Sequence, residues 1–164
     1  MSITPYNREK AIAYAHKWAY RRNPAYYNFE RIGGDCTNFT SQCILNGYAV
    51  MNYSPVFGWY YIDASHRSPS WTGVEYLYPF IVNNKGVGPF AKAVSIRAIQ
   101  PGDFVQLKFS LNQFQHSPFV VDVGNPPSVE NILVAAHTYD TDYRPLNTYH
   151  WSDIRFIHIL GVRR

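Results

Sequence analysis

The sequence predicts an α+β fold in which helices come first and an antiparallel sheet follows. Three helices are expected in the first half of the chain, over about 5–22, 36–45 and 70–84. From about residue 94 the pattern changes to short runs rich in β-branched and aromatic residues, separated by turn sequences. Helices and strands that occupy separate parts of a chain are typical of an α+β fold with an antiparallel sheet.

The first helix is expected to begin after Thr4, which can cap it, with Pro5 in its first turn. Asn23-Pro24 ends it. Apolar residues at i, i+3, i+4 and i+7 form one face of this helix: Ala11, Tyr14, Ala15 and Trp18. The helix is therefore expected to pack this face against the rest of the chain.

The second helix is expected to begin at Cys36 and to end before Asn46-Gly47. The third is expected over 70–84, where Pro79 would break or kink it. The aromatic-rich segment 50–70 between them has no clean period and is interpreted as an ordered loop.

Four strands are expected in the second half, over 104–109, 117–123, 132–137 and 155–162. Gln100-Pro101-Gly102-Asp103 forms the turn before the first of them. The chain has no repeats, low-complexity tracts or linkers, so a single domain covering 1–164 is expected.

The composition and net charge indicate which classes of binding partner suit the chain. Hydrophobic residues make up 46% of the chain and aromatic residues 17%, including 14 Tyr. Tyrosines suit a core and also a groove for peptide or sugar. The net charge of +4 favours anionic partners such as cell-wall polymers, but no dense Lys/Arg run indicates nucleic-acid binding.

No run approaching about eighteen apolar residues is present, so no membrane span and no membrane partner are expected. Residues 1–8 lack the basic and then apolar pattern of a signal peptide. The chain as written is expected to be cytoplasmic, unless it is exported by a route that the sequence does not show. A monomer is expected.

The two cysteines, Cys36 and Cys43, fall in the same expected helix. Seven residues of helix separate them by about 10 Å. A disulfide requires Cα atoms within about 7 Å of each other. Both thiols are therefore expected to be free, with Cys43 acting as a small core residue beside Ile44.

Cys36 is the candidate nucleophile, because it opens a helix directly after Gly33-Gly34-Asp35. The unpaired N–H groups and partial positive charge of a helix N-terminus favour the thiolate, which is the nucleophilic form. The same N–H groups could hold the oxyanion of a tetrahedral intermediate. A buried, inert cysteine is the structural alternative.

A cysteine nucleophile needs a base, and His116 and His137 are the candidates. They flank a predicted hairpin that is symmetric about Pro126-Pro127, so they would face each other across it. His116 would then be the base and His137 would orient it, with Asp140 as the rival orienting group. A structural or solvated role is expected for the other four histidines, His16, His66, His150 and His158.

The metal-binding alternative has little support. The chain has no C-x-x-C and no pair of histidines at a helical ligand spacing. No metal and no cofactor are expected.

Several strings resemble the putative amidase domain family, a branch of the papain-like superfamily that is related to the NlpC-type and CHAP enzymes. The string Gly33-Gly34-Asp35-Cys36-Thr37-Asn38-Phe39-Thr40-Ser41-Gln42 resembles the nucleophile segment of that family. The similarity continues, in chain order, at 100–103, 116–117, 137–140 and 145–146.

The resemblance implies a papain-like, NlpC-like α+β fold. It implies Cys36 as nucleophile, His116 as general base and acid, and His137 as the third polar residue. Tyr27, or Tyr26, would lie near the oxyanion, and Asp35 would support that site. Pro118 departs from the pattern, because proline cannot donate to a sheet ladder.

The sequence therefore predicts a cysteine amidase or peptidase that acts through an acyl-enzyme, with peptide or peptidoglycan-type substrates. Two alternatives stay open. One is a non-catalytic module that binds cell-wall polymers or peptides. The other is an acyltransferase that hands the same acyl group to an amine.

Overall fold

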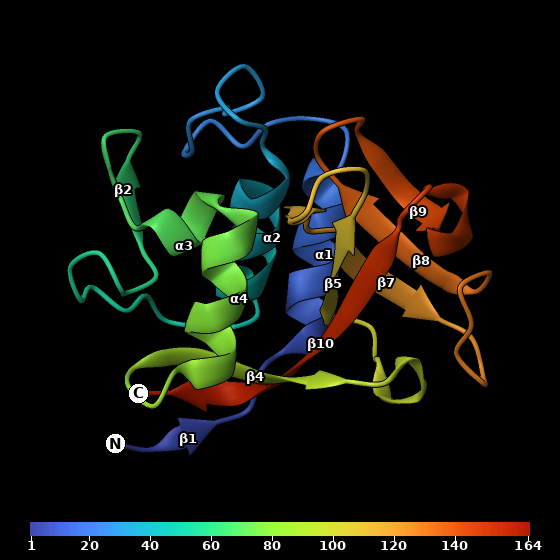
Figure 1. Ribbon diagram of the computed structural model, residues 1–164. Helices are drawn as coiled ribbons and strands as arrows, with labels where there is room; N and C mark the ends of the chain where they lie inside the picture. The colour runs from blue at the N-terminus through green and yellow to red at the C-terminus, as the bar shows by residue number, and fades with distance from the viewer.

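A computed structural model describes all residues, 1–164. An antiparallel sheet of eight strands curls along one side of the molecule, and α1 and α2 stand against one of its faces (Figure 1). The chain runs through β1 (Ile3–Thr4), α1 (Arg8–Trp18), α2 (Cys36–Asn46), β2 (Tyr61–Asp63), β3 (His66–Arg67), α3 (Pro69–Thr72), α4 (Val74–Asn83), β4 (Gly88–Val94), the 3₁₀ turn η1 (Ile96–Ala98), β5 (Phe104–Lys108), β6 (Phe114–His116), β7 (Phe119–Val123), β8 (Ile132–Ala136), β9 (Thr141–Pro145), the 3₁₀ turn η2 (Leu146–Thr148) and β10 (Asp153–Arg163). The predicted α+β class with an antiparallel sheet is confirmed.

The strand order is β1-β10-β5-β7-β8-β9, with β4 also paired to β10 and β6 to β5. The long strand β10 is central, since it pairs with β1, β4 and β5. None of the helices is both long and apolar enough to cross a membrane.

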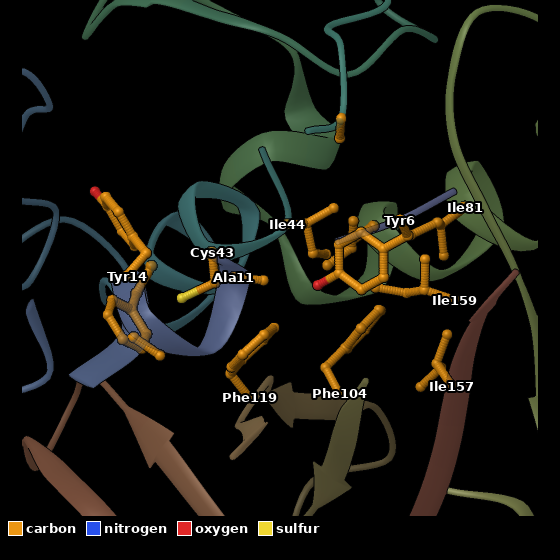
Figure 2. Close-up of a cluster of buried hydrophobic side chains, with 14 of the residues drawn as sticks. Tyr6, Ala11, Tyr14, Cys43, Ile44, Ile81, Phe104, Phe119, Ile157 and Ile159 are labelled. Carbon is orange, nitrogen blue, oxygen red and sulfur yellow. The ribbon is translucent and has the colours of Figure 1, made fainter. Parts of the chain in front are cut away.

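The main hydrophobic core lies between the helices and the sheet (Figure 2). Ala11 of α1 and Cys43 of α2 meet Phe104 of β5 and Phe119 of β7 there, all of them fully buried. Alternate residues of the same strands point to the opposite face and build a second cluster with η2, for example Val105. Both cysteines are free, as predicted, and Cys43 is a core residue.

Helix α2 is buried on all sides although half of it is polar. Its polar side chains bind neighbouring elements instead of water. The Thr40 hydroxyl donates to the Ser117 carbonyl at 2.6 Å, and Gln42 accepts a hydrogen bond from the Tyr14 hydroxyl at 2.6 Å. Because buried polar groups need partners, these residues fix α2 against both α1 and the sheet.

The first helix is shorter than predicted. Asn7 caps it, since its side chain accepts from the Lys10 N–H at 2.9 Å. The predicted cap, Thr4, lies instead in β1 opposite Val162. The end of α1 at Trp18 also precedes the expected one.

The third predicted helix is two helices, α3 and α4. They are separated at Gly73, whose backbone is extended with φ −108° and ψ 123°. Pro79, the predicted breaking point, lies inside α4. The segment 50–70, interpreted as a loop, contains the short β2–β3 hairpin.

The predicted hairpin of 117–123 and 132–137 forms with a shifted register. Phe119 lies opposite Ala135, whereas symmetry about Pro126-Pro127 would have placed it opposite Val134. The chain before Pro118 leaves this hairpin and forms β6, in which His116 pairs with Leu107 of β5. The expected face-to-face placement of His116 and His137 is therefore wrong.

Candidate active site

Cys36 is the first residue of α2 and lines a surface cavity of about 440 Å³. Only 6% of the residue is exposed, but its surroundings are polar. The sulfur lies 3.8 Å from the Thr37 hydroxyl, which in turn lies 3.0 Å from the Ser117 hydroxyl. Glu75 and Gln115 line the same cavity, so the thiol is not sealed in hydrocarbon.

The turn before Cys36 depends on its two glycines. Gly33 and Gly34 have φ values of +85° and +97°, a region that residues with a side chain rarely adopt. A Cβ on Gly34 would also lie 3.2 Å from the Thr138 hydroxyl oxygen. These two residues let the chain turn tightly into the helix, so that the thiol is presented at its first position.

His116 ends β6 and is 5% exposed. Its ring packs beside Tyr149 and Phe109, with centroids 5.5 and 6.4 Å apart. The Nε2 atom is buried and has no hydrogen-bond partner. The ring lines a second cavity, of about 410 Å³. An imidazole with a free nitrogen at a cavity wall is able to accept a proton from a bound group.

Ser117 joins the segment that carries His116 to the helix that carries Cys36. Its hydroxyl lies 3.0 Å from the Thr37 hydroxyl, and its carbonyl accepts from Thr40. Gln115 borders both cavities, so the one beside Cys36 and the one beside His116 adjoin. Ser117 and Gln115 thus connect the surroundings of the predicted nucleophile with those of the predicted base.

Burial decides the charges of the pair. Burial raises the pKa of Cys36. Hydrogen bonding by Ser117 and Thr37 offsets part of this rise, and the negative charge of Asp35 adds to it. Burial, and then the charge of Arg144, lowers the pKa of His116 to about 4. At neutral pH the free protein therefore holds a thiol and a neutral imidazole. The expected resting thiolate is not favoured, because desolvation outweighs the helix N-terminus.

His137 does not orient His116. Its Nδ1 lies 2.5 Å from Oδ2 of Asp35, and its Nε2 lies 2.8 Å from the carbonyl oxygen of Trp18. The ring also stacks on Phe39 with centroids 4.2 Å apart. Both nitrogens are occupied, so His137 links the end of α1, the start of α2 and the end of β8.

Asp35 holds the backbone just before Cys36 and cannot itself stabilise an oxyanion. One carboxylate oxygen accepts from the Phe29 N–H at 2.8 Å and the Asn38 amide at 2.9 Å. The other lies beside His137 and 3.4 Å from Nε of Arg22. An ionised carboxylate only accepts hydrogen bonds, so Asp35 holds the turn that places Cys36.

Asp140, the rival orienting group, pairs with Arg22. The guanidinium donates to both carboxylate oxygens, at 2.7 and 3.0 Å. This ion pair occupies the carboxylate that was expected to orient His116.

Tyr27 is 46% exposed and packs against Phe29, and it does not line the cavity of Cys36. Tyr26, the other tyrosine considered there, stacks on Trp71. The tyrosine that does line this cavity is Tyr76.

Two residues at the second cavity escaped the sequence analysis. The Tyr149 hydroxyl is buried without a partner, and the guanidinium of Arg144 lies 3.6 Å from the centre of the Tyr149 ring. The one signal in the sequence was the concentration of Tyr, Arg and His over 139–150, directly after His137.

Three of the other histidines have structural partners, as expected. His16, His66 and His158 lie 2.7 to 2.8 Å from carboxylates of Asp142, Asp63 and Asp103. His150 is exposed and lines the second cavity. No group of three or more His, Cys, Asp or Glu side chains is arranged to hold a metal ion.

Comparisons with known proteins identify the family of the chain. The chain is similar to "Uncharacterized protein YhbB" of Bacillus subtilis (strain 168), with 36% identity over 152 residues, which are 90% of this chain and 44% of that relative. It thus spans less than half the length of this relative. No solved structure matches the chain. Residues 5–160 match the family described as "Putative amidase domain", and the chain therefore belongs to that family.

Proposed function

We propose that the protein hydrolyses an amide bond through a thioester formed on Cys36, with His116 as general base and acid. The family name supports amide chemistry. The assignment of residues rests on one observation, which is that Ser117, the residue after His116, is hydrogen-bonded to Thr37 and Thr40 of the helix that Cys36 begins.

In the first half of the reaction the sulfur attacks the amide carbonyl carbon, and its proton passes to His116. The carbonyl oxygen becomes an oxyanion, which the unpaired N–H groups of the first turn of α2 can stabilise. His116 then gives the proton to the amide nitrogen. The C–N bond breaks, the free amine leaves and the acyl group stays on sulfur.

In the second half a water molecule attacks the thioester. His116 takes a proton from the water as the C–O bond forms, and returns it to the sulfur as the C–S bond breaks. The products are a carboxylic acid, an amine and the regenerated thiol.

No polar side chain orients His116 in this scheme. Packing against Phe109 and Tyr149 holds the ring, and the register of β6 with β5 holds its backbone. A neutral imidazole beside a thiol can accept the proton during attack, so the two groups need not form an ion pair beforehand.

The arrangement of a helix-borne cysteine and a strand-borne histidine supports a papain-like, NlpC-like interpretation of the fold. We place the whole reaction in one catalytic unit, 1–164, that acts as a monomer. Peptides, and cell-wall peptides in particular, are the substrates that its basic, aromatic-rich chain suits best.

The test is incubation with peptidoglycan fragments and small peptides, followed by mass analysis of the products. Cys36→Ala and His116→Ala are each expected to abolish turnover while the circular dichroism spectrum stays unchanged. Cys43→Ala, which removes the other thiol from the core, is the matched control and is expected to retain activity.

Full activity of the Cys36→Ala or the His116→Ala protein would contradict the proposal. Binding without turnover by the wild-type protein would show a binding module. Transfer of the acyl group to an added amine in preference to water would show an acyltransferase.

A further inference from the structure

We propose that the amine half of the substrate carries a carboxylate and that Arg144 binds it in the cavity beside His116. This inference rests on the proposed amide hydrolysis and names the class of leaving group, which is an amino acid or short peptide with a free carboxyl group.

Arg144 is held in place but lacks an anionic partner. Its Nε donates to the Thr148 hydroxyl at 2.7 Å and its Nη2 to the Thr148 carbonyl at 3.1 Å. The guanidinium stacks on the ring of Tyr149 at 3.6 Å. Neither of these bonds uses Nη1, and no carbonyl or carboxylate of the protein accepts from it, so this nitrogen can donate to a ligand.

Two other arginines, by contrast, lie near carboxylates. Arg22 pairs with Asp140, and Arg155 lies 3.8 Å from Glu75. No carboxylate of the protein lies within ion-pair distance of Arg144. A preoriented guanidinium without a counter-ion at the wall of a cavity is suited to bind a carboxylate.

The cavity has the size and character for such a group. Its volume of about 410 Å³ holds an amino acid or a short peptide, and aromatic side chains line it, among them Tyr139, Tyr149 and His150. Tyr139 is 87% exposed, so the cavity is open at this side. A ligand could therefore extend from the site along the surface.

The chemistry indicates which half of the substrate enters this cavity. The acyl group stays on the sulfur and therefore belongs to the cavity that Cys36 lines. The amine takes its proton from His116 and therefore leaves through the cavity that His116 lines. Because Arg144 lies in the second cavity, the carboxylate belongs to the leaving amine.

A bound carboxylate would also assist the base. Burial is the main reason why the pKa of His116 is low, and the charge of Arg144 is the second. A negative charge placed on Arg144 offsets this second effect and makes His116 a better proton acceptor. The correct leaving group thus contributes to its own release.

The experiment compares N-acetylated dipeptides that have a free C-terminal carboxylate with the same dipeptides as C-terminal amides. The wild-type protein is expected to cleave the acids with a kcat/KM about 10-fold or more above that for the amides, since hydrogen bonds to charged groups are strong. Arg144→Met is expected to remove this difference. Arg21→Met is the matched control, because Arg21 also stacks on an aromatic ring, that of Trp18, but lies outside the cavity.

A binding measurement separates this inference from the proposed function. Calorimetric titration of the Cys36→Ala protein with the same acids and amides needs no turnover. Tighter binding of the acids, lost in the Cys36→Ala, Arg144→Met double variant, supports the inference even if hydrolysis is not observed. Equal binding of acids and amides, or a preference that survives Arg144→Met, overturns it even if Cys36 proves to be the nucleophile.

Discussion

Cys36 and His116 share an environment that disfavours charge on either of them. Burial raises the pKa of the thiol and lowers that of the imidazole. Moving the proton from sulfur to nitrogen creates two opposite charges that attract each other in a medium of low dielectric constant. In the proposed mechanism, the proton transfer therefore accompanies the attack on the substrate.

This arrangement predicts activity that extends to unusually low pH. His116 stays neutral, and able to accept a proton, until the pH falls to about 4. The acid limb of kcat/KM is therefore expected near pH 4, well below the ordinary histidine value of about 6.5. The profile should be measured with an uncharged substrate. An acid limb at pH 6 or above would show that His116 is not kept neutral by its burial.

A second prediction concerns Asp35, whose carboxylate binds His137 and lies beside Arg22 in the interior. Asp35→Asn leaves these cationic or donor groups without their anionic partner. The free energy of unfolding is expected to fall by about 3 kcal/mol, as for other broken buried pairs. Urea denaturation measures the change.

The chain offers a matched control in the pair of Asp63 and His66, which is exposed. Asp63→Asn is expected to leave the free energy of unfolding nearly unchanged, because an exposed ion pair contributes little to stability. A similar small effect of Asp35→Asn would show that the buried carboxylate does not hold the turn before Cys36.

At the scale of elements, the turn at Gly33-Gly34 and the start of α2 together determine the position of the thiol. Both glycines have positive φ values, but only Gly34 approaches another group, the hydroxyl of Thr138. Gly33 has open space where a Cβ would be. A substitution at Gly33 therefore tests only the need for a positive φ, whereas one at Gly34 also tests the close approach of Thr138.

Gly33→Ala is expected to lower the free energy of unfolding by about 1–2 kcal/mol, the cost of a left-handed conformation for a residue with a side chain. Gly34→Ala is expected to cost more, because Thr138 must also move. Urea denaturation of both variants tests this order, and the rate of Cys36 alkylation reports on the position of the thiol. Equal decreases in the free energy of unfolding of the two variants would show that contact with Thr138 does not add to the cost at Gly34.

The elements that could be predicted were those with local signals. Helix α2 has a glycine turn before it and Asn46-Gly47 at its end, and its predicted start is confirmed. The cap of α1 could not be predicted, because Thr4 is withdrawn into a strand with Val162, at the other end of the chain. The break at Gly73 was missed since Pro79 is the stronger breaker in sequence.

At the scale of the whole molecule, the same distinction applies to the site. Cys36 and His116 were predicted as nucleophile and base from short strings and their order, and Ser117 joins the segments that carry them. The role of His137 depends on Asp35, 102 positions away in the sequence, and on the carbonyl of Trp18. No local pattern indicates a contact of that kind, and the hairpin whose symmetry suggested another partner has a shifted register and ends before His116.

Burial of His116 also has a consequence for the stability of the entire fold. Its pKa is about 4 in the folded state and about 6.5 in the unfolded chain. Between these values the unfolded chain binds more protons, so stability is fully present above pH 6.5 and falls as the pH drops toward 4. The loss from this residue is about 3 kcal/mol.

His116→Gln is expected to remove that part of the pH dependence. Urea denaturation at pH 4.5 and pH 7 gives the difference in unfolding free energy for each protein, and comparison of the two cancels the other titrating groups. Identical pH dependence of both proteins would show that His116 is accessible to protons in the folded state.

The pairing of β1 with β10 brings the first and last residues together, since the backbones of Ser2 and Arg164 exchange hydrogen bonds at 3.1 and 2.9 Å. A few glycines could join these positions, and new ends could be opened in the exposed stretch around Pro55, far in sequence from both Cys36 and His116. Such a circular permutant should fold to the same sheet. For the same reason, residues 1–164 could be inserted into a loop of another protein without separating β1 from β10.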